Sequence, residues 1–82
     1  MPKSAEITAE IGFALRQAVQ AVNDHAGETC VHVRFADDPG EIDFIANAAR
    51  FADGAFEFQA GIETLAGSVE EIDAIRTEVI GH

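Results

Sequence analysis

The chain has 82 residues, of which fifteen are Asp or Glu and five are Lys or Arg, so its formal net charge is −10 at pH 7. A surface this acidic is repelled by phosphate backbones and by anionic lipids, which argues against direct binding of nucleic acid or of a membrane. It favours attraction to basic protein surfaces instead.

The length predicts one domain, residues 1–82, with one core of modest size. The hydrophobic share of 48% is too high for a disordered acidic chain. Because Cys30 is the one cysteine, no internal disulfide can form, which suits a reducing compartment. The N-terminus shows no secretory signal, and no apolar run reaches the roughly 20 residues that span a bilayer. We therefore expect a cytoplasmic protein.

The N-terminal third has two interpretations. Apolar residues between positions 15 and 22 recur at helical spacing, and a helix through them would end at Gly27. This helix could begin at a Ser4 cap, or residues 5–9 could form an edge strand with Gly12 as the break. A glycine inside a helix costs roughly 1 kcal/mol relative to alanine, which favours the break slightly.

Two segments alternate between apolar and other side chains, which is the pattern of a strand with one buried face. They are residues 29–35 and 55–60. The outer face of the first strand would carry Cys30, His32 and Arg34. Because both strands are half buried, we expect an open-faced sheet with solvent on one side.

The segment 38–41, Asp-Pro-Gly-Glu, combines a helix N-cap, a proline at the first helical position and a capping acid at the third. Apolar residues follow it at helical spacing until Gly54. This pattern predicts a helix over residues 39–53.

The segment 68–71, Ser-Val-Glu-Glu, is a second capping box, and apolar residues again follow at helical spacing. It predicts a helix over residues 69–80 that Gly81 ends. Residues 61–67, before it, could form a short third strand or an irregular loop. The elements together predict an α+β fold, a small open-faced sandwich with three helices on one face of a sheet.

Residues 7–18, Ile-Thr-Ala-Glu-Ile-Gly-Phe-Ala-Leu-Arg-Gln-Ala, with Val22 and Gly27 after them, resemble the start of the HPr phosphocarriers, a strand followed by Gly-Leu-His-x-Arg-Pro-Ala. The matching positions are Gly12, Arg16 and Ala18. Ala14 stands where that family has its phosphorylated histidine, and Gln17 where it has proline. The resemblance implies a sheet with three helices on one side, in a degenerate HPr-like domain that lacks the phosphorylation site.

Cys30 and His32 share a predicted strand face, with His25 and several aspartates nearby, and these residue types bind zinc. The spacing of these residues is not that of a structural zinc site, and a fourth ligand is missing, so a solvated strand face with a polar histidine and a small cysteine is the favoured interpretation. A cysteine–histidine nucleophile would need a stabilised thiolate, which Arg34 on the same face would favour, but the sequence supplies no oxyanion hole and no substrate cleft. We predict no enzyme activity, no cofactor and no metal.

A candidate interface lies on the predicted helix over residues 39–53. Phe44, Ala48 and Phe51 fall on one side of that helix, offset from its isoleucines. If the sheet covers the isoleucines, this second side stays partly exposed and would contact a partner protein or a second copy of the chain.

Three hypotheses for function follow. The first is a non-enzymatic regulatory or protein-binding module with a basic partner. The second is an acidic inhibitor that mimics nucleic acid and binds a DNA- or RNA-binding protein, although the carboxylates are spread over every predicted element rather than along one face. The third is a phosphate-relay or metal-binding protein that uses His32 and Cys30.

Overall fold

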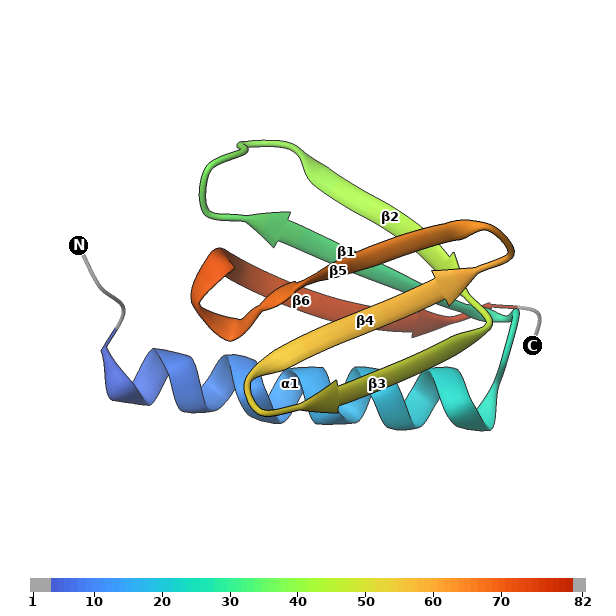
Figure 1. Cartoon of the computed structure of the whole chain (residues 1–82), viewed down its shortest axis with the longest axis horizontal. Helices are drawn as coiled ribbons and strands as arrows, with labels where there is room; N and C mark the ends of the chain where they lie inside the picture. The colour runs from blue at the N-terminus through green and yellow to red at the C-terminus, as the bar shows by residue number, and fades with distance from the viewer. Residues whose placement is uncertain (1–3, 81–82) are drawn as a thin grey trace.

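The structure, a computed structural model, describes residues 4–80, in which one long helix is followed by six strands and one short 3₁₀ turn (Figure 1). The elements are α1 (Ala5–Asp24), β1 (Thr29–Phe35), β2 (Glu41–Ala46), β3 (Ala48–Ala52), β4 (Ala55–Ala60), β5 (Glu63–Ser68), η1 (Val69–Glu71) and β6 (Ile72–Val79). The strands form two antiparallel three-stranded sheets, in the orders β2-β1-β6 and β3-β4-β5. Among residues 4–80, no helix has both the length and the apolar character needed to cross a lipid bilayer.

The predicted sandwich of three helices on one sheet is therefore wrong, while a mixed α+β composition remains. The strands expected at residues 29–35 and 55–60 are confirmed as β1 and β4. Most of residues 61–67 belong to β5, so the strand alternative is correct for that segment.

Helix α1 begins at Ser4, whose side-chain Oγ accepts a hydrogen bond from the backbone N–H of Ile7 at 3.2 Å. It continues through Gly12, so the helix interpretation of the N-terminal segment is correct and the predicted break is wrong. The buried residues of this helix are Ile11, Leu15, Ala18 and Val22. Burial of this apolar face supplies more free energy than one mid-helix glycine costs.

The helix predicted over residues 39–53 is wrong, because this segment forms β2 and β3. Asp38 does not cap a helix: its Oδ1 accepts from the backbone N–H of Gly40 at 2.9 Å, inside the turn between β1 and β2. An aspartate side chain can satisfy a turn as readily as a helix N-terminus. Residues 41–46 then alternate between exposed and more buried positions, which is strand periodicity.

Gly54, predicted to end a helix, instead lies in a two-residue hairpin turn. Asp53 and Gly54 have φ values of 54° and 77°, and they join β3 to β4 beside the paired residues Ala52 and Ala55. Positive φ at both central residues defines the turn that matches strand twist, and Asp-Gly is a preferred sequence for it.

The helix predicted over residues 69–80 is also wrong. The capping acid acts as expected, since Glu71 Oε1 accepts from the backbone N–H of Ser68 at 2.9 Å, but only the turn η1 forms. Residues 75–79 pair with residues 29–33 of β1, which gives their β-branched side chains a pleated surface to pack on. The predicted helix end at Gly81 lies outside the described residues.

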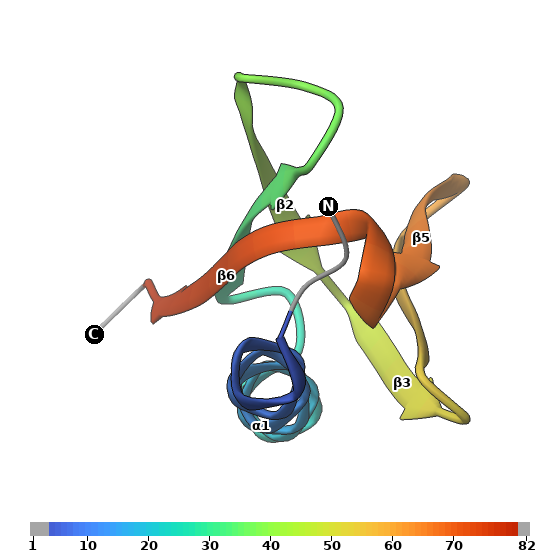
Figure 2. The same cartoon turned by 90° about the vertical axis from the view of Figure 1, so that its left-hand side faces the viewer.

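The core lies between one face of α1 and the inner faces of the two sheets. Helix α1 packs mainly against β3 and β6, as the end-on view shows (Figure 2). The largest fully buried side chains of the core include Phe58, Leu15, Ile72, Val22, Val31 and Val33. The other face of the β2-β1-β6 sheet points away from this core and carries the polar side chains described next.

Candidate functional site

The outer face of the β2-β1-β6 sheet carries the three residues that the sequence placed together, Cys30, His32 and Arg34. They alternate along β1 with Val31 and Val33, which are fully buried in the core. His32 lies opposite Asp43 on β2 and opposite Arg76 on β6. The central strand therefore presents its histidine between two strands that carry charged residues.

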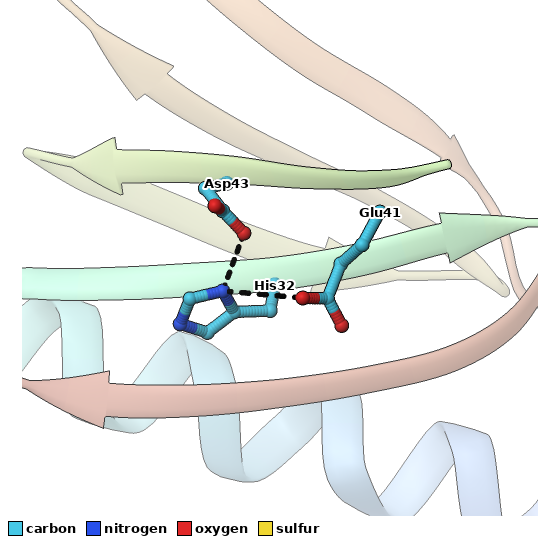
Figure 3. A group of neighbouring side chains, drawn as sticks. All are labelled: His32, Glu41 and Asp43. Atoms are coloured by element: carbon cyan, nitrogen blue, oxygen red, sulfur yellow. Dashed lines mark hydrogen bonds and ion pairs between the residues drawn. The ribbon is translucent and has the colours of Figure 1, made fainter.

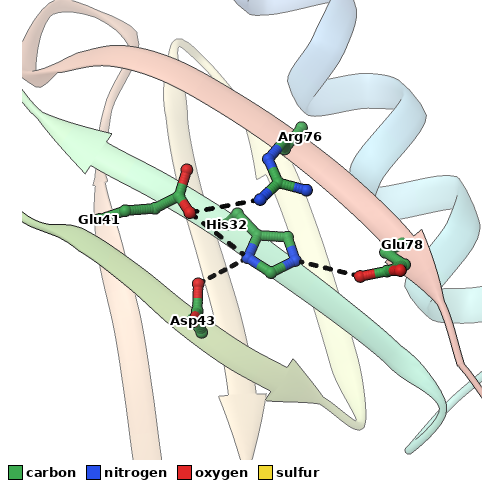
Figure 4. Close-up of polar contacts among 5 residues, drawn as sticks. All are labelled: His32, Glu41, Asp43, Arg76 and Glu78. Carbon is green, nitrogen blue, oxygen red and sulfur yellow. Dashed lines mark hydrogen bonds and ion pairs between the residues drawn. The ribbon is translucent and has the colours of Figure 1, made fainter.

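Three carboxylates surround the imidazole of His32. Its Nδ1 lies 2.5 Å from Asp43 Oδ1 and 3.8 Å from Glu41 Oε1 (Figure 3). Its Nε2 lies 3.6 Å from Glu78 Oε1 on β6, and Arg76 pairs with Glu41 at 3.3 Å (Figure 4). We call this group of five residues the His32 cluster.

The imidazole is buried although the sheet face around it is polar. His32 is 8% exposed, whereas the side chains of Glu41, Asp43 and Glu78 are 46%, 64% and 62% exposed. The Nε2 atom is inaccessible and has no hydrogen-bond partner within the described part of the chain. Leaving a buried polar atom unsatisfied costs about 1–3 kcal/mol, and most buried polar atoms in folded proteins have a partner, so the unpaired Nε2 is unusual.

Cys30 lies on the same face but does not join the cluster. It is half-buried and sits opposite Ile45 on β2 and Glu78 on β6. Burial raises the pKa of the Cys30 thiol, and the negative charge of Asp43 raises that pKa further. The site thus disfavours the thiolate that a cysteine nucleophile needs.

The candidate metal ligands of the sequence analysis do not converge. His25 follows the last turn of α1, and Cys30 is outside the group of donor atoms that lie close together. That group consists of His32, Glu41 and Asp43, whose ligand atoms all lie within 4.8 Å of one another.

The predicted interface of Phe44, Ala48 and Phe51 rested on a helix that does not exist. Phe44 belongs to β2 and Phe51 to β3, in two different sheets, and both pack against the core. Ala48, at the start of β3, is exposed. These three residues therefore form no common exposed face.

Sequence reasoning missed Glu41, Asp43, Arg76 and Glu78, because it assigned all four to helices. The alternation of residues 41–46 and of residues 75–79 was the available signal. Only the pairing of both segments with β1 brings these side chains to one face.

Comparison of the chain with protein-family models, with curated proteins and with solved structures gave no match. The resemblance to HPr therefore stays a prediction from the sequence. In the structure residues 7–18 all lie in α1, whereas the HPr signature places a strand before its glycine.

Proposed function

We propose that this chain is a small, acidic, non-enzymatic module that binds a basic protein through the outer face of the β2-β1-β6 sheet. One observation carries the proposal: on this face Ile45, which is 48% exposed, stands beside carboxylates. The face, called the acidic face below, consists of Cys30, His32, Arg34, Glu41, Asp43, Ile45, Ala74, Arg76 and Glu78.

The acidic face has the composition of a small interface. Ile45 and its cross-strand neighbour Cys30 form an apolar spot, and the carboxylates of Asp43 and Glu78 lie at its margin. Apolar centres with polar rims are common in protein interfaces. The rim charges, together with the net charge of −10, attract a basic partner and lose strength as salt screens them.

A second copy of the chain fits this face less well. A symmetric dimer through the acidic face would bring Glu41, Asp43 and Glu78 of one copy against the same carboxylates of the other. Like charges in a contact oppose association. The homodimer expected from the sequence is therefore less favoured than a basic partner.

The test is affinity capture from a host lysate with the wild type and two matched variants, Ile45→Asp and Ile62→Asp. Ile62 is fully exposed, at 103%, in the β4–β5 turn of the other sheet, so its replacement changes charge and apolarity equally but away from the acidic face. We expect the wild type and the Ile62→Asp variant to retain the same basic protein, and Ile45→Asp to lose it. Moderate salt should also release this protein.

Two results would contradict the proposal. One is equal capture by both variants, and the other is a captured protein whose surface is acidic. A captured DNA-binding protein that competing DNA releases would support the nucleic-acid mimic instead. Dimerisation of the purified chain that Ile45→Asp abolishes would replace the basic partner with a second copy.

A further inference from the structure

The His32 cluster also contains the ligand set of a metal site. Two carboxylates and one imidazole nitrogen lie within 4.8 Å of one another, on two adjacent strands. We propose that His32, Glu41 and Asp43 bind one first-row divalent metal ion, for which Zn²⁺ is the best match. This inference does not depend on the protein partner proposed above.

The backbone holds these ligands in place. His32 and Asp43 are directly opposed across β1 and β2, and Glu41 lies two residues before Asp43, hence on the same side of its strand. Paired strands hold such side chains at a fixed separation, which limits the rearrangement that binding requires.

The buried imidazole is the independent observation that points to a ligand. His32 is only 8% exposed, its Nδ1 is hydrogen-bonded to Asp43 Oδ1 and lies 3.8 Å from Glu41 Oε1, and its Nε2 has no hydrogen-bond partner among the described residues. A metal ion on Nδ1 replaces the proton that Nδ1 shares with Asp43, and the proton of the neutral ring then stands on Nε2. Glu78 Oε1, 3.6 Å from Nε2, needs only a small movement to accept it. Metal-bound histidines usually donate their second N–H to a carboxylate, a backbone carbonyl or water, and Glu78 is the nearby group that can take this role.

The donor atoms and their spacing favour zinc over magnesium or calcium. Bonds from zinc to nitrogen or oxygen are about 2.0–2.2 Å long, which places two ligand atoms of a tetrahedral ion about 3.3 Å apart. To reach this separation, the distance from Nδ1 to Asp43 must lengthen from 2.5 Å and that to Glu41 must shorten from 3.8 Å, and rotation of exposed side chains allows both changes. An imidazole ligand suits zinc, whereas magnesium and calcium prefer oxygen alone. Because Glu41 and Asp43 are largely exposed, water can complete the coordination.

Arg76 opposes the ion and therefore offers a specific test. The Arg76 guanidinium forms an ion pair with Glu41 at 3.3 Å, so a metal ion competes with Arg76 for the Glu41 carboxylate. Arg34 carries the same charge on the same face and has no ion pair with Glu41 in the described structure. Removal of Arg76 should therefore tighten metal binding more than removal of Arg34.

The experiment is isothermal titration of the full chain with zinc chloride. We expect one saturable site in the wild type, weakened about tenfold or more in each of Asp43→Asn and Glu41→Gln. Glu63→Gln, an equal charge change on β5, should leave the affinity unchanged. Arg76→Ala should tighten binding about threefold, as expected for one partly screened charge near the ion, and Arg34→Ala should do less.

Asp43 and Glu41 are exposed, so replacing them does not open the core, and circular dichroism verifies that each variant is folded. The proposal is overturned if the wild type shows no saturable zinc site. It is equally overturned if Asp43→Asn and Glu63→Gln change the affinity by the same factor, which would indicate diffuse attraction to an acidic surface.

Discussion

His32 and Thr29 are buried polar residues on the same strand, and they differ in how their polar atoms are satisfied. The hydroxyl of Thr29 lies 3.1 Å from the carbonyl oxygen of Ala21 and 3.0 Å from that of His25, at the end of α1. Both oxygens also accept a backbone N–H, Ala21 from His25 and His25 from Glu28, so this contact gives the buried hydroxyl its hydrogen-bond partner. The Nε2 of His32 has no hydrogen-bond partner in the described structure, so this buried polar atom stays unsatisfied.

At the same scale, Cys30 gives a prediction about pH. Burial and the charge of Asp43 raise the pKa of its thiol above the ordinary value of 9.0. Since the thiolate is the reactive form, iodoacetamide should alkylate Cys30 at about pH 8 more slowly in the folded chain than in urea. Asp43→Asn should speed the folded reaction, because it removes a charge that opposes ionisation. Equal rates in the folded chain and in urea would contradict this account.

The raised pKa also affects folding. A group whose pKa is higher in the folded state stabilises that state below the pKa of the unfolded chain, and this contribution is lost as the pH rises through the folded pKa. The free energy of unfolding of the wild type should therefore fall above about pH 9 more steeply than that of Cys30→Ser, which lacks the thiol. Parallel urea titrations of both proteins across this range measure the difference.

At the scale of elements, substitutions at two glycines test the backbone conformation without changing side-chain packing. Gly12 lies inside α1 and Gly54 has a φ of 77° in the β3–β4 turn, and a Cβ atom at either position meets no atom within 4 Å. Gly12→Ala should raise the free energy of unfolding by about 0.5–1 kcal/mol, through helix propensity. Gly54→Ala should lower it by about 1–2 kcal/mol, because a left-handed conformation is costly for alanine. Urea denaturation measures both, and two shifts of the same sign would contradict the assigned elements.

The elements also show what could be predicted from the sequence. β1 and β4 were predictable because each alternates strictly and contains no competing helix signal. Residues 38–54 contain both a helix start at Asp38 and an Asp-Gly hairpin turn at Asp53, and the segment by itself does not show which signal dominates. Pairing with β1 decides between them, and that pairing involves residues distant in the sequence.

The candidate site was predictable to the same extent as the elements. The shared face of Cys30, His32 and Arg34 followed from the alternation of one strand. Glu41 lies in β2 and Glu78 lies in β6, and the three strands of the second sheet separate these two elements in the sequence. The two carboxylates come close to His32 only because β2 and β6 both pair with β1. A site built across strands depends on the fold, so an error in the fold concealed it.

At the scale of the whole molecule, charge is the dominant property. The chain has fifteen Asp or Glu residues and five Lys or Arg residues, and folding brings the excess negative charges closer together. We expect the melting temperature to rise by several degrees as sodium chloride increases from about 0.01 M to about 0.15 M, where the Debye length falls from about 30 Å to about 8 Å. Scanning calorimetry at several salt concentrations measures this rise. A melting temperature that falls over this range would contradict net repulsion in the folded state.

The central claim is that zinc binds to the buried imidazole of His32 rather than to the acidic surface in general. Long-range ¹H–¹⁵N NMR of the histidine rings, recorded before and after addition of one equivalent of zinc, tests this claim most directly. We predict a shift of the Nδ1 resonance of His32 that reports metal coordination, with Nε2 as the protonated nitrogen. An unchanged His32 ring, with zinc-dependent shifts confined to His25 or His82, would contradict the claim.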